Sequence, residues 1–149
     1  NAFNKMADAA KKDGRKLVVT SSYRPYSSQK RLYNNYVSSD GKQAADTYSA
    51  RPGHSEHQTG LVVDLAGTNS SGAYDLNAFE ASAEYTWMRA NAYKYGFILR
   101  FPKEDEKITG YMYEPWHYRY VGLDTAKIIY EEKLCFEKYW AKYLWNKEN

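Results

Sequence analysis

The sequence predicts an α+β fold, in which helices pack against a small, mostly antiparallel sheet. Helical patterns alternate with short apolar segments along the chain, and the later of these segments are spaced like hairpin pairs. The length of 149 residues suits one domain and leaves no room for a second of ordinary size. We therefore expect residues 1–149 to form a single domain.

The expected helices share apolar residues at helical spacing, often with a capping residue before them or a glycine after them. In chain order, these patterns predict helices from Phe3 to Ala10 with Gly14 as the stop, from Ser27 or Ser28 to Val37, from Asp40-Gly41 to about Tyr48, from Asn77 to Lys94, and from Asp124 to Lys133. In the fourth helix, Asn77 and Glu80 form a start that resembles a capping box, and Gly96 marks the end.

The expected strands are short and rich in β-branched or aromatic residues. They cover residues 17–20, 61–66, 97–101, 111–113 and 116–121. In the second strand, a period of two places Val62, Asp64 and Ala66 on one face and the alternate apolar residues on the other. The polar stretch 67–75 and the charged stretch 102–109 carry no strand pattern and are expected to be solvated loops.

Composition excludes several classes of protein. Hydrophobic residues make up 43% and charged residues 26% of the chain, which is typical of a globular protein and not of a disordered one. The net charge of +3, with the two signs interleaved, does not indicate a nucleic-acid partner. No apolar run approaches the roughly 20 residues of a membrane span, so we expect no membrane contact by this domain. The single cysteine, Cys135, permits no internal disulfide and cannot anchor a thiolate metal site.

Tyrosine is unusually frequent, with 16 residues within an aromatic fraction of 17%. Aromatic side chains with polar tips suit a half-wet groove that binds a polymer or a peptide. They could equally build a small core from large side chains, so composition leaves both interpretations open.

A carboxylate in the middle of an apolar strand is the first sign of a functional site. Asp64 would be costly to bury unpaired, so it pairs with a buried arginine, reaches solvent at a strand end, or binds a metal. In the loop predicted over residues 50–60, Gly60 allows a tight turn that would bring His57 back toward the strand. His57 alone would indicate a surface histidine, but His57 and Asp64 together in so apolar a run indicate a metal site.

A second polar cluster combines Glu114 with His117. Pro115 biases Glu114 away from helical angles, so the pair is not expected to be a helical metal-binding pair. An extended segment would instead point His117 at a neighbouring strand. Considered alone, this cluster would indicate a surface glutamate and a packed histidine beside Trp116.

Together, the two clusters supply two histidines, one aspartate and one further glutamate. Two histidines and one carboxylate leave a fourth coordination position open, which is typical of catalytic and not of structural zinc. Glu114 would then be the general base for water activated by the zinc. The same ligands could hold iron(II), but His57 and Asp64 are seven residues apart and the strands are few, so zinc is the stronger interpretation.

An arginine near this site suggests how a substrate could be held. Arg24 follows a predicted strand and precedes Pro25, so its backbone is held stiffly, and Gln29 lies five residues later. A fixed guanidinium beside a zinc site suits bidentate capture of a substrate carboxylate, whereas without the metal cluster it would indicate a surface turn. His54 and Glu56, which lie in the same loop as the first cluster, receive no role.

These residues resemble the signature of VanY-type D-alanyl-D-alanine carboxypeptidases, in two spaced motifs, Ser55-x-His57-x-x-Gly60-x-x-x-Asp64 and Glu114-x-Trp116-His117. The group of zinc peptidases to which that family belongs also contains VanX-type dipeptidases, LdcB-like L,D-carboxypeptidases, peptidoglycan endolysins and hedgehog domains. The resemblance runs from about Phe3 to about Tyr139 and includes the segments around Arg24 and over 95–102. One departure is Val62, where the family usually has alanine, and the bulkier side chain would narrow the pocket without removing a ligand.

The resemblance implies a LAS/hedgehog-like zinc peptidase fold and a bacterial cell-wall enzyme that acts outside the membrane, secreted or anchored through a segment absent from this chain. The implied reaction is removal of the C-terminal D-Ala from peptidoglycan stem peptides, with Zn²⁺ as cofactor and the enzyme as a monomer. The implied roles are metal binding by His57, Asp64 and His117, general base catalysis by Glu114, and substrate binding by Arg24, Ser55, Gln29, Tyr113 and Trp116.

Two alternatives remain open from the sequence. An L,D-carboxypeptidase that trims tetrapeptide stems would share the same motifs. A non-catalytic, zinc-containing wall-binding module would belong to a different class, but such a module has no reason to keep Glu114 as a base beside an open zinc position. The motifs likewise leave open whether the enzyme serves vancomycin resistance or ordinary wall maturation.

Overall fold

A five-stranded sheet lies at the centre of the computed structural model, which describes residues 1–145. The strands are β1 (Val18–Ser21), β2 (Val62–Thr68), β3 (Tyr74–Asp75), β4 (Phe97–Leu99) and β5 (His117–Tyr120). The main path runs β1-β2-β5-β4, and β3 pairs with β2 beside it. Every pairing is antiparallel, which confirms the predicted sheet. Residues 146–149 of the predicted domain lie outside the described part of the chain.

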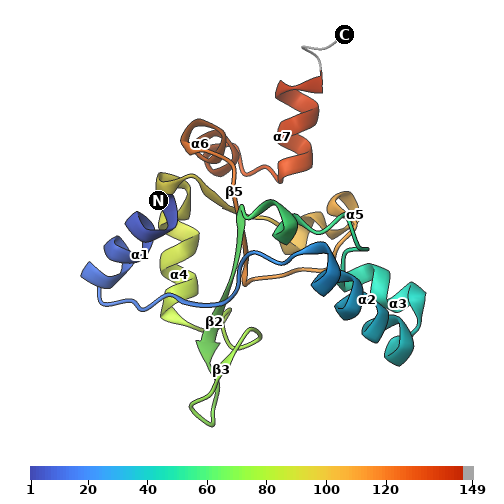
Figure 1. The fold of residues 1–149 in the computed structure, drawn as a ribbon. Helices are drawn as coiled ribbons and strands as arrows, with labels where there is room; N and C mark the ends of the chain where they lie inside the picture. Colours follow the sequence, from blue (N-terminus) through green and yellow to red (C-terminus); the bar gives the residue numbers. More distant parts are fainter. Residues whose placement is uncertain (146–149) are drawn as a thin grey trace.

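Helices cover both faces of this sheet. They are α1 (Ala2–Lys12), α2 (Tyr26–Asp40), α3 (Lys42–Tyr48), α4 (Ala83–Asn91), α5 (Glu106–Thr109), α6 (Leu123–Glu131) and α7 (Phe136–Tyr143), with short 3-10 helices η1 (Glu56–Thr59), η2 (Ala92–Tyr95) and η3 (Lys103–Asp105). In Figure 1, α1 and α4 lie on one side of β2, whereas α2, α3 and α5 lie on the other. None of the helices in the described range has both the length and the apolar character needed to cross a bilayer.

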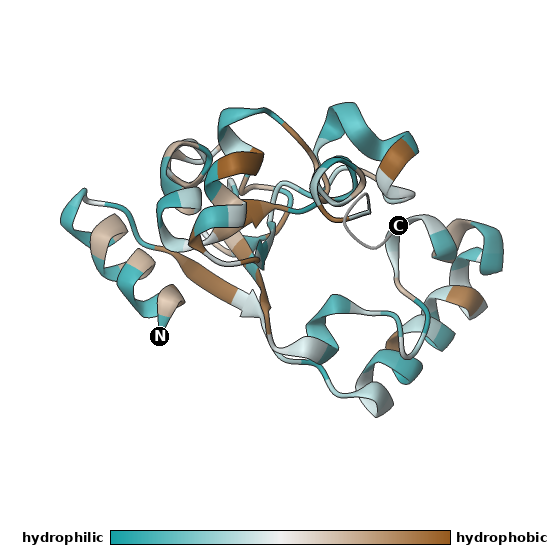
Figure 2. Cartoon of the chain, turned by 90° about the horizontal axis from the view of Figure 1, so that it is seen from above, coloured by the Kyte–Doolittle hydropathy of each residue, from teal (hydrophilic) through white to brown (hydrophobic). Residues whose placement is uncertain are grey.

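The alternation predicted along β2 positions the functional residues. Val63 and Leu65 belong to the main hydrophobic core, together with side chains from α1, α4 and β5. Asp64 points to the opposite face, where it meets two histidines. Figure 2 shows hydrophobic colouring concentrated on the central strands and hydrophilic colouring over most of the flanking helices. One face of the sheet is therefore a core, and the other holds a polar site.

The start predicted for the fourth helix is wrong. Helix α4 begins at Ala83, and the side chain of Ser82 accepts a hydrogen bond from the backbone N–H of Tyr85 at 3.1 Å. The backbone N–H of Asn77 instead donates to the carboxylate of Asp75. The true cap therefore lies five residues later than the predicted one, because Asn77 belongs to a turn.

Two other helix starts differ slightly from the predictions. Helix α2 begins at Tyr26, directly after Pro25, and no side chain caps it. Proline is favoured at this boundary because the lost N–H would have no helical partner. Helix α6 begins after Gly122, so Asp124 lies in the first turn instead of at the cap.

Residues 111–113 do not form the predicted strand, because their backbone groups bond elsewhere. The N–H of Met112 donates to the carbonyl of Thr47 in α3 at 3.2 Å. The N–H of Tyr113 donates to the carboxylate of Glu106 at 2.7 Å. This segment therefore ties the site to α3 and α5 and does not extend the sheet.

The predicted loop over 102–109 is wrong as well, because it contains η3 and α5. One of its charged residues, Asp105, is buried and not solvated: it is 3% exposed and pairs with Lys138 at 2.5 Å. Lys138 belongs to α7, a helix that is not among those predicted from the sequence. The ion pair therefore ties α7 to this helical segment.

Candidate metal centre

Three buried side chains from different segments meet on one face of the sheet. They are His57 in η1, Asp64 in β2 and His117 at the start of β5. The Nε2 atom of His57 lies 3.1 Å from Oδ2 of Asp64, and the Nδ1 atom of His117 lies 3.1 Å from Oδ1. One ligand atom from each residue lies within 4.8 Å of the others. The sheet itself sets part of this arrangement, because Asp64 and His117 are directly opposite in the pairing of β2 with β5.

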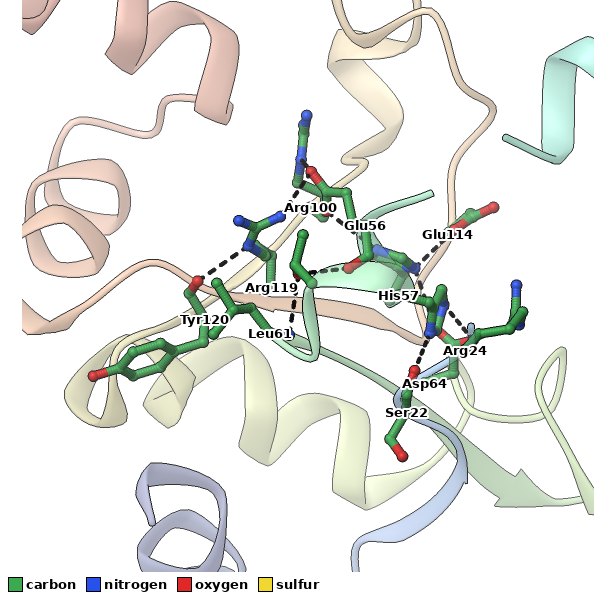
Figure 3. Close-up of polar contacts among 12 residues, drawn as sticks. Ser22, Arg24, Glu56, His57, Leu61, Asp64, Arg100, Glu114, Arg119 and Tyr120 are labelled. Carbon is green, nitrogen blue, oxygen red and sulfur yellow. Dashed lines mark hydrogen bonds and ion pairs between the residues drawn. The ribbon is translucent and has the colours of Figure 1, made fainter. Parts of the chain in front are cut away.

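The turn after His57 explains how this ring reaches the strand. Gly60 has a φ of 70°, a left-handed conformation that favours glycine, and its N–H donates to the carbonyl of His57. The Nδ1 atom of His57 lies 2.6 Å from the carbonyl oxygen of Ser22, just beyond β1. A ring nitrogen that donates to a backbone carbonyl fixes the tautomer and leaves the other nitrogen free as a ligand. The predicted tight turn at Gly60 is thus confirmed, and Nε2 points toward Asp64 (Figure 3).

The chemistry of Asp64 fits a metal cation. Burial alone would raise the pKa of its carboxyl group, but the adjacent His117 and His57 lower that pKa to about 2. Its Oδ1 atom is buried and accepts no hydrogen bond, although buried carboxylate oxygens nearly always have a partner. An ionised carboxylate with a spare oxygen between two imidazoles is the donor set expected of a zinc site with an open position.

Glu114 is held at the edge of this cluster in a different environment. Its Oε2 atom lies 3.4 Å from Nδ1 of His117, and its backbone N–H donates to the carbonyl of Phe101 at 3.2 Å. The side chain is 10% exposed. Burial, followed by the negative charges of Asp64 and Glu56, raises the pKa of Glu114 to about 7. A carboxyl group with this pKa can both take up and release a proton near neutral pH.

Arg24, which is predicted to bind a substrate carboxylate, lies beside the cluster in a fixed orientation. Its Nη1 atom donates to Oε1 of Gln29 at 2.8 Å, and its Nη2 atom donates to Oγ of Ser21 at 2.9 Å. The Nη2 atom of Arg24 also lies 4.0 Å from Oδ2 of Asp64. Gln29 is 1% exposed, and its amide donates to the carbonyl of Ala50. In this structure, Gln29 therefore braces Arg24.

These groups line a cavity of about 460 Å³. Of the predicted substrate-binding residues, Arg24, Gln29, Ser55 and Trp116 contribute to its lining. Tyr113 lies elsewhere: its hydroxyl meets that of Tyr85 at 2.8 Å and donates to Glu80 at 3.1 Å. The aromatic lining comes instead from Tyr36, Tyr48, Phe101, Tyr111 and Trp116.

Sequence reasoning missed a charged group behind the cluster. The carboxylate of Glu56 accepts a hydrogen bond from Nε of Arg100 at 2.8 Å and lies 3.4 Å from Nη1 of Arg119. Its other oxygen lies 3.5 Å from Nε2 of His117. Figure 3 shows Arg100 and Glu56 side by side, close to His57. The one available signal was that Glu56 immediately precedes His57 in the first motif.

Comparison with known sequences agrees with the motifs. The family model described as VanY: D-alanyl-D-alanine carboxypeptidase matches residues 1–123. The putative carboxypeptidase YodJ of Bacillus subtilis (strain 168) is 48% identical over 143 residues, which are 95% of this chain and 52% of that protein. A D-alanyl-D-alanine carboxypeptidase of Enterococcus faecalis is 40% identical over 141 residues, 89% of this chain and 50% of that protein. The chain therefore spans about half the length of these curated relatives.

Solved structures share the fold. The LdcB LD-carboxypeptidase superposes with a TM-score of 0.86 at 48% identity, covering 95% of this chain and 65% of that one. A VanY D,D-pentapeptidase mutant from the VanB-type resistance cassette, in complex with Zn(II), gives a TM-score of 0.78 at 37% identity, covering 93% and 79%. These neighbours confirm the predicted LAS-type zinc peptidase fold. Because sequence motifs, fold and family model agree over most of its length, the chain belongs to the VanY family of D-alanyl-D-alanine carboxypeptidases.

Proposed function

We propose that this chain is a zinc-dependent D,D-carboxypeptidase that removes the C-terminal D-Ala from peptidoglycan stem peptides. The observation that carries the proposal is the convergence of His57, Asp64 and His117 beside Glu114, in a cavity that Arg24 also lines. The comparisons support it, because a VanY relative contains Zn(II) and VanYB has been solved with D-alanine-D-alanine.

In this proposal, Nε2 of His57, a carboxylate oxygen of Asp64 and Nδ1 of His117 would hold the zinc ion. Zinc bound there would supply Lewis-acid chemistry and lower the pKa of a water molecule toward neutrality. The carbonyl of Ser22 keeps the His57 ring in the tautomer that leaves Nε2 unprotonated. The protein contributes by holding these side chains in a buried position from which bulk water is largely excluded.

Glu114 acts as the general base and then as the general acid. Its carboxylate takes a proton from the attacking water and passes that proton to the departing amine of D-Ala. Burial raises the pKa of Glu114 above the usual value for a carboxyl group, which favours its release of the proton to the amine. Its position 3.4 Å from His117 keeps it next to the metal ligands.

Arg24 is proposed to bind the terminal carboxylate of the substrate. A free carboxylate is what distinguishes a chain end from a chain middle, and a guanidinium binds it with two charge-assisted hydrogen bonds. Gln29 and Ser21 hold the guanidinium before substrate arrives, which lowers the ordering cost of binding. Ser55 and Trp116 would contact the same peptide from the cavity wall. Tyr113, also predicted to bind substrate, would act from outside that wall.

An L,D-carboxypeptidase acting on tetrapeptide stems is the second candidate. The specific observation in its favour is the 48% identity with the LdcB LD-carboxypeptidase, against 37% with the VanY mutant. A non-catalytic wall-binding module is disfavoured, because such a module has no need of a glutamate placed as a base beside the proposed metal ligands.

We further propose that residues 1–149 form one catalytic domain, that it is a monomer, and that it works on the outer face of a bacterial cell. The substrate supports the location, since peptidoglycan stem peptides lie outside the membrane. Zinc-loaded protein incubated with tripeptide, tetrapeptide and pentapeptide stems, followed by mass spectrometry, tests the function. Loss of one D-Ala from the pentapeptide is expected, and loss from the tetrapeptide would favour the second candidate. A zinc-loaded protein that leaves every stem intact would contradict both.

A further inference from the structure

The strand pairing brings a buried arginine next to a predicted metal ligand. Arg100 directly follows β4, and its backbone N–H donates to the carbonyl oxygen of His117 at 3.1 Å. This bond continues the β4–β5 ladder by one residue beyond the paired Leu99. The side chain of Arg100 is only 10% exposed, although arginine is rarely buried without a partner.

Each of the three guanidinium nitrogens of Arg100 donates a hydrogen bond to a carboxylate. Its Nε donates to Glu56 at 2.8 Å, and its two terminal nitrogens donate to the two oxygens of Glu137 at 3.0 and 2.5 Å. A bidentate pair of this kind fixes both distance and orientation. Through these three hydrogen bonds, Arg100 links Glu56 in η1 to Glu137 in α7.

Glu56 in turn faces the far side of a metal ligand. Its Oε2 atom lies 3.5 Å from Nε2 of His117, and both atoms are buried without a hydrogen-bond partner. The other ring nitrogen of His117 is the one that faces Asp64. A histidine that binds a metal through one nitrogen usually donates the N–H of the other to a carboxylate, which fixes the tautomer and strengthens the ligand. The positions of Oε2 of Glu56 and Nε2 of His117 fit such a carboxylate–histidine pair.

We infer that Glu137 on α7, acting through Arg100 and Glu56, positions the metal ligand His117. This inference rests on the zinc site of the proposed function. Glu56, Arg100 and Glu137 are positioning residues and not catalytic ones, because none of them is a ligand of the metal or the proposed base. Helix α7 lies beyond residues 1–123, which the family model matches, so the inference extends the functional unit past that boundary.

Zinc affinity measured by competition with a chromophoric chelator tests the inference. In the Glu56→Gln variant, the amide oxygen can still accept from Arg100, but the negative charge behind His117 is lost. We expect zinc affinity to fall about 10- to 100-fold, the usual effect of losing such a partner. For Glu137→Gln, we expect a smaller loss in the same direction, because Glu56 remains but Arg100, which holds it, loses its bidentate partner. Glu137 is 31% exposed, so this substitution should not prevent folding.

Glu132 provides the matched control. It also fastens α7, through Lys142 at 2.8 Å and through Tyr143, but it contacts neither Arg100 nor Glu56. Glu132→Gln should therefore loosen α7 and leave zinc affinity unchanged. Replacing zinc with cobalt(II) adds a second measurement, because the visible spectrum of cobalt reports ligand geometry. The spectrum should change in Glu56→Gln and Glu137→Gln and remain as in wild type in Glu132→Gln.

Several results would overturn the inference. Wild-type zinc affinity in Glu56→Gln would remove Glu56 as the partner of His117. Equal affinity and equal cobalt spectra in Glu137→Gln and Glu132→Gln would remove the link to α7. If the wild-type protein bound no zinc, the proposed function would fail together with this inference. If the wild-type protein bound zinc, and Glu56→Gln and Glu137→Gln had the same zinc affinity and cobalt spectrum as wild type, this inference alone would be overturned.

Discussion

Strand β2 separates two buried regions, one made of apolar side chains and the other of charged and polar ones. On the core side, Leu65 is 0% exposed and packs among apolar side chains from α1, α4 and β5. On the site side, Asp64 is 5% exposed and faces two histidines and an arginine. The hydrophobic effect stabilises the first region directly, whereas burial of the second has a cost that only cations and hydrogen bonds offset.

Stability and function therefore depend on opposite faces of one strand. Substitutions on the core side should change the free energy of unfolding and leave metal binding intact in the folded protein. Substitutions on the site side should change metal binding or turnover more than they change stability. The predictions below test this separation.

The largest effect is expected for the proposed base. Glu114→Ala should lower turnover by about two to four decades, because the proton of the attacking water loses its acceptor. Zinc content and the unfolding midpoint should stay close to wild type. Steady-state rates on a free-acid stem peptide, with metal analysis of the same samples, provide the measurement. A variant that hydrolyses the peptide at nearly the wild-type rate would exclude Glu114 from the mechanism and revive the binding-module interpretation.

The next effect is expected at Arg24. Arg24→Ala and Arg24→Lys should each reduce kcat/KM by the equivalent of about 2–5 kcal/mol, because one partner of a desolvated charge pair is lost. Zinc should be retained in both variants. Wild-type protein should barely cleave the same peptide with an amidated C-terminus. Equal cleavage of the amidated and free-acid peptides would show that Arg24 does not bind the terminal carboxylate of the substrate. That result would indicate an endopeptidase.

On the core side, Leu65→Ala should reduce the free energy of unfolding by about 2–5 kcal/mol, since the side chain is fully buried and leaves a cavity. Val19→Ala is the matched control: Val19 lies on β1, is 39% exposed and should cost far less. Urea unfolding of the zinc-free proteins measures both values. If the folded Leu65→Ala protein bound less zinc than wild type, the separation between the two faces would be wrong.

A smaller effect is expected from pH. Burial raises the pKa of Glu56, but His117 and Arg100 more than offset it and lower that pKa from 4.5 to about 2. Because the folded pKa is the lower one, Glu56 stabilises the protein above pH 4.5, and this contribution is lost as the pH falls toward about 2. The stability difference between wild type and Glu56→Gln, on the order of 1 kcal/mol after allowance for solvent, should shrink over that range. Urea unfolding of zinc-free protein at several pH values would reveal a constant difference if this account were wrong.

The accuracy of the sequence predictions follows the range of the interactions involved. Strand β2 and its two faces could be predicted because alternation is local to one segment. The clustering of the four residues at the candidate site could be predicted because Asp64 stands out in an apolar run, His57 shortly precedes that run, and Glu114 lies close to His117 in sequence. The pairing of Glu56 with Arg100 could not be predicted, because 44 residues separate them and only the folded sheet brings them together.

The same reasoning explains the errors in the predicted secondary structure. The strand expected over 111–113 failed because its N–H groups bond to Thr47 and to the side chain of Glu106, and no local pattern encodes either contact. The helix expected from Asn77 failed because Ser82 is an equally good cap close to the same stripe. Charge on Asp105 suggested exposure, but Lys138 from α7 neutralises it in the folded protein.

Zinc content is the most direct test of the central claim, which is that His57, Asp64 and His117 form a metal site. Wild-type protein should contain about one zinc per chain after loading and desalting, whereas His57→Ala and His117→Ala should contain almost none. His54→Ala is the matched control, because His54 is exposed, lines the same cavity and is not part of the cluster. This variant should keep the wild-type zinc content. Full zinc occupancy in either His57→Ala or His117→Ala would contradict the account.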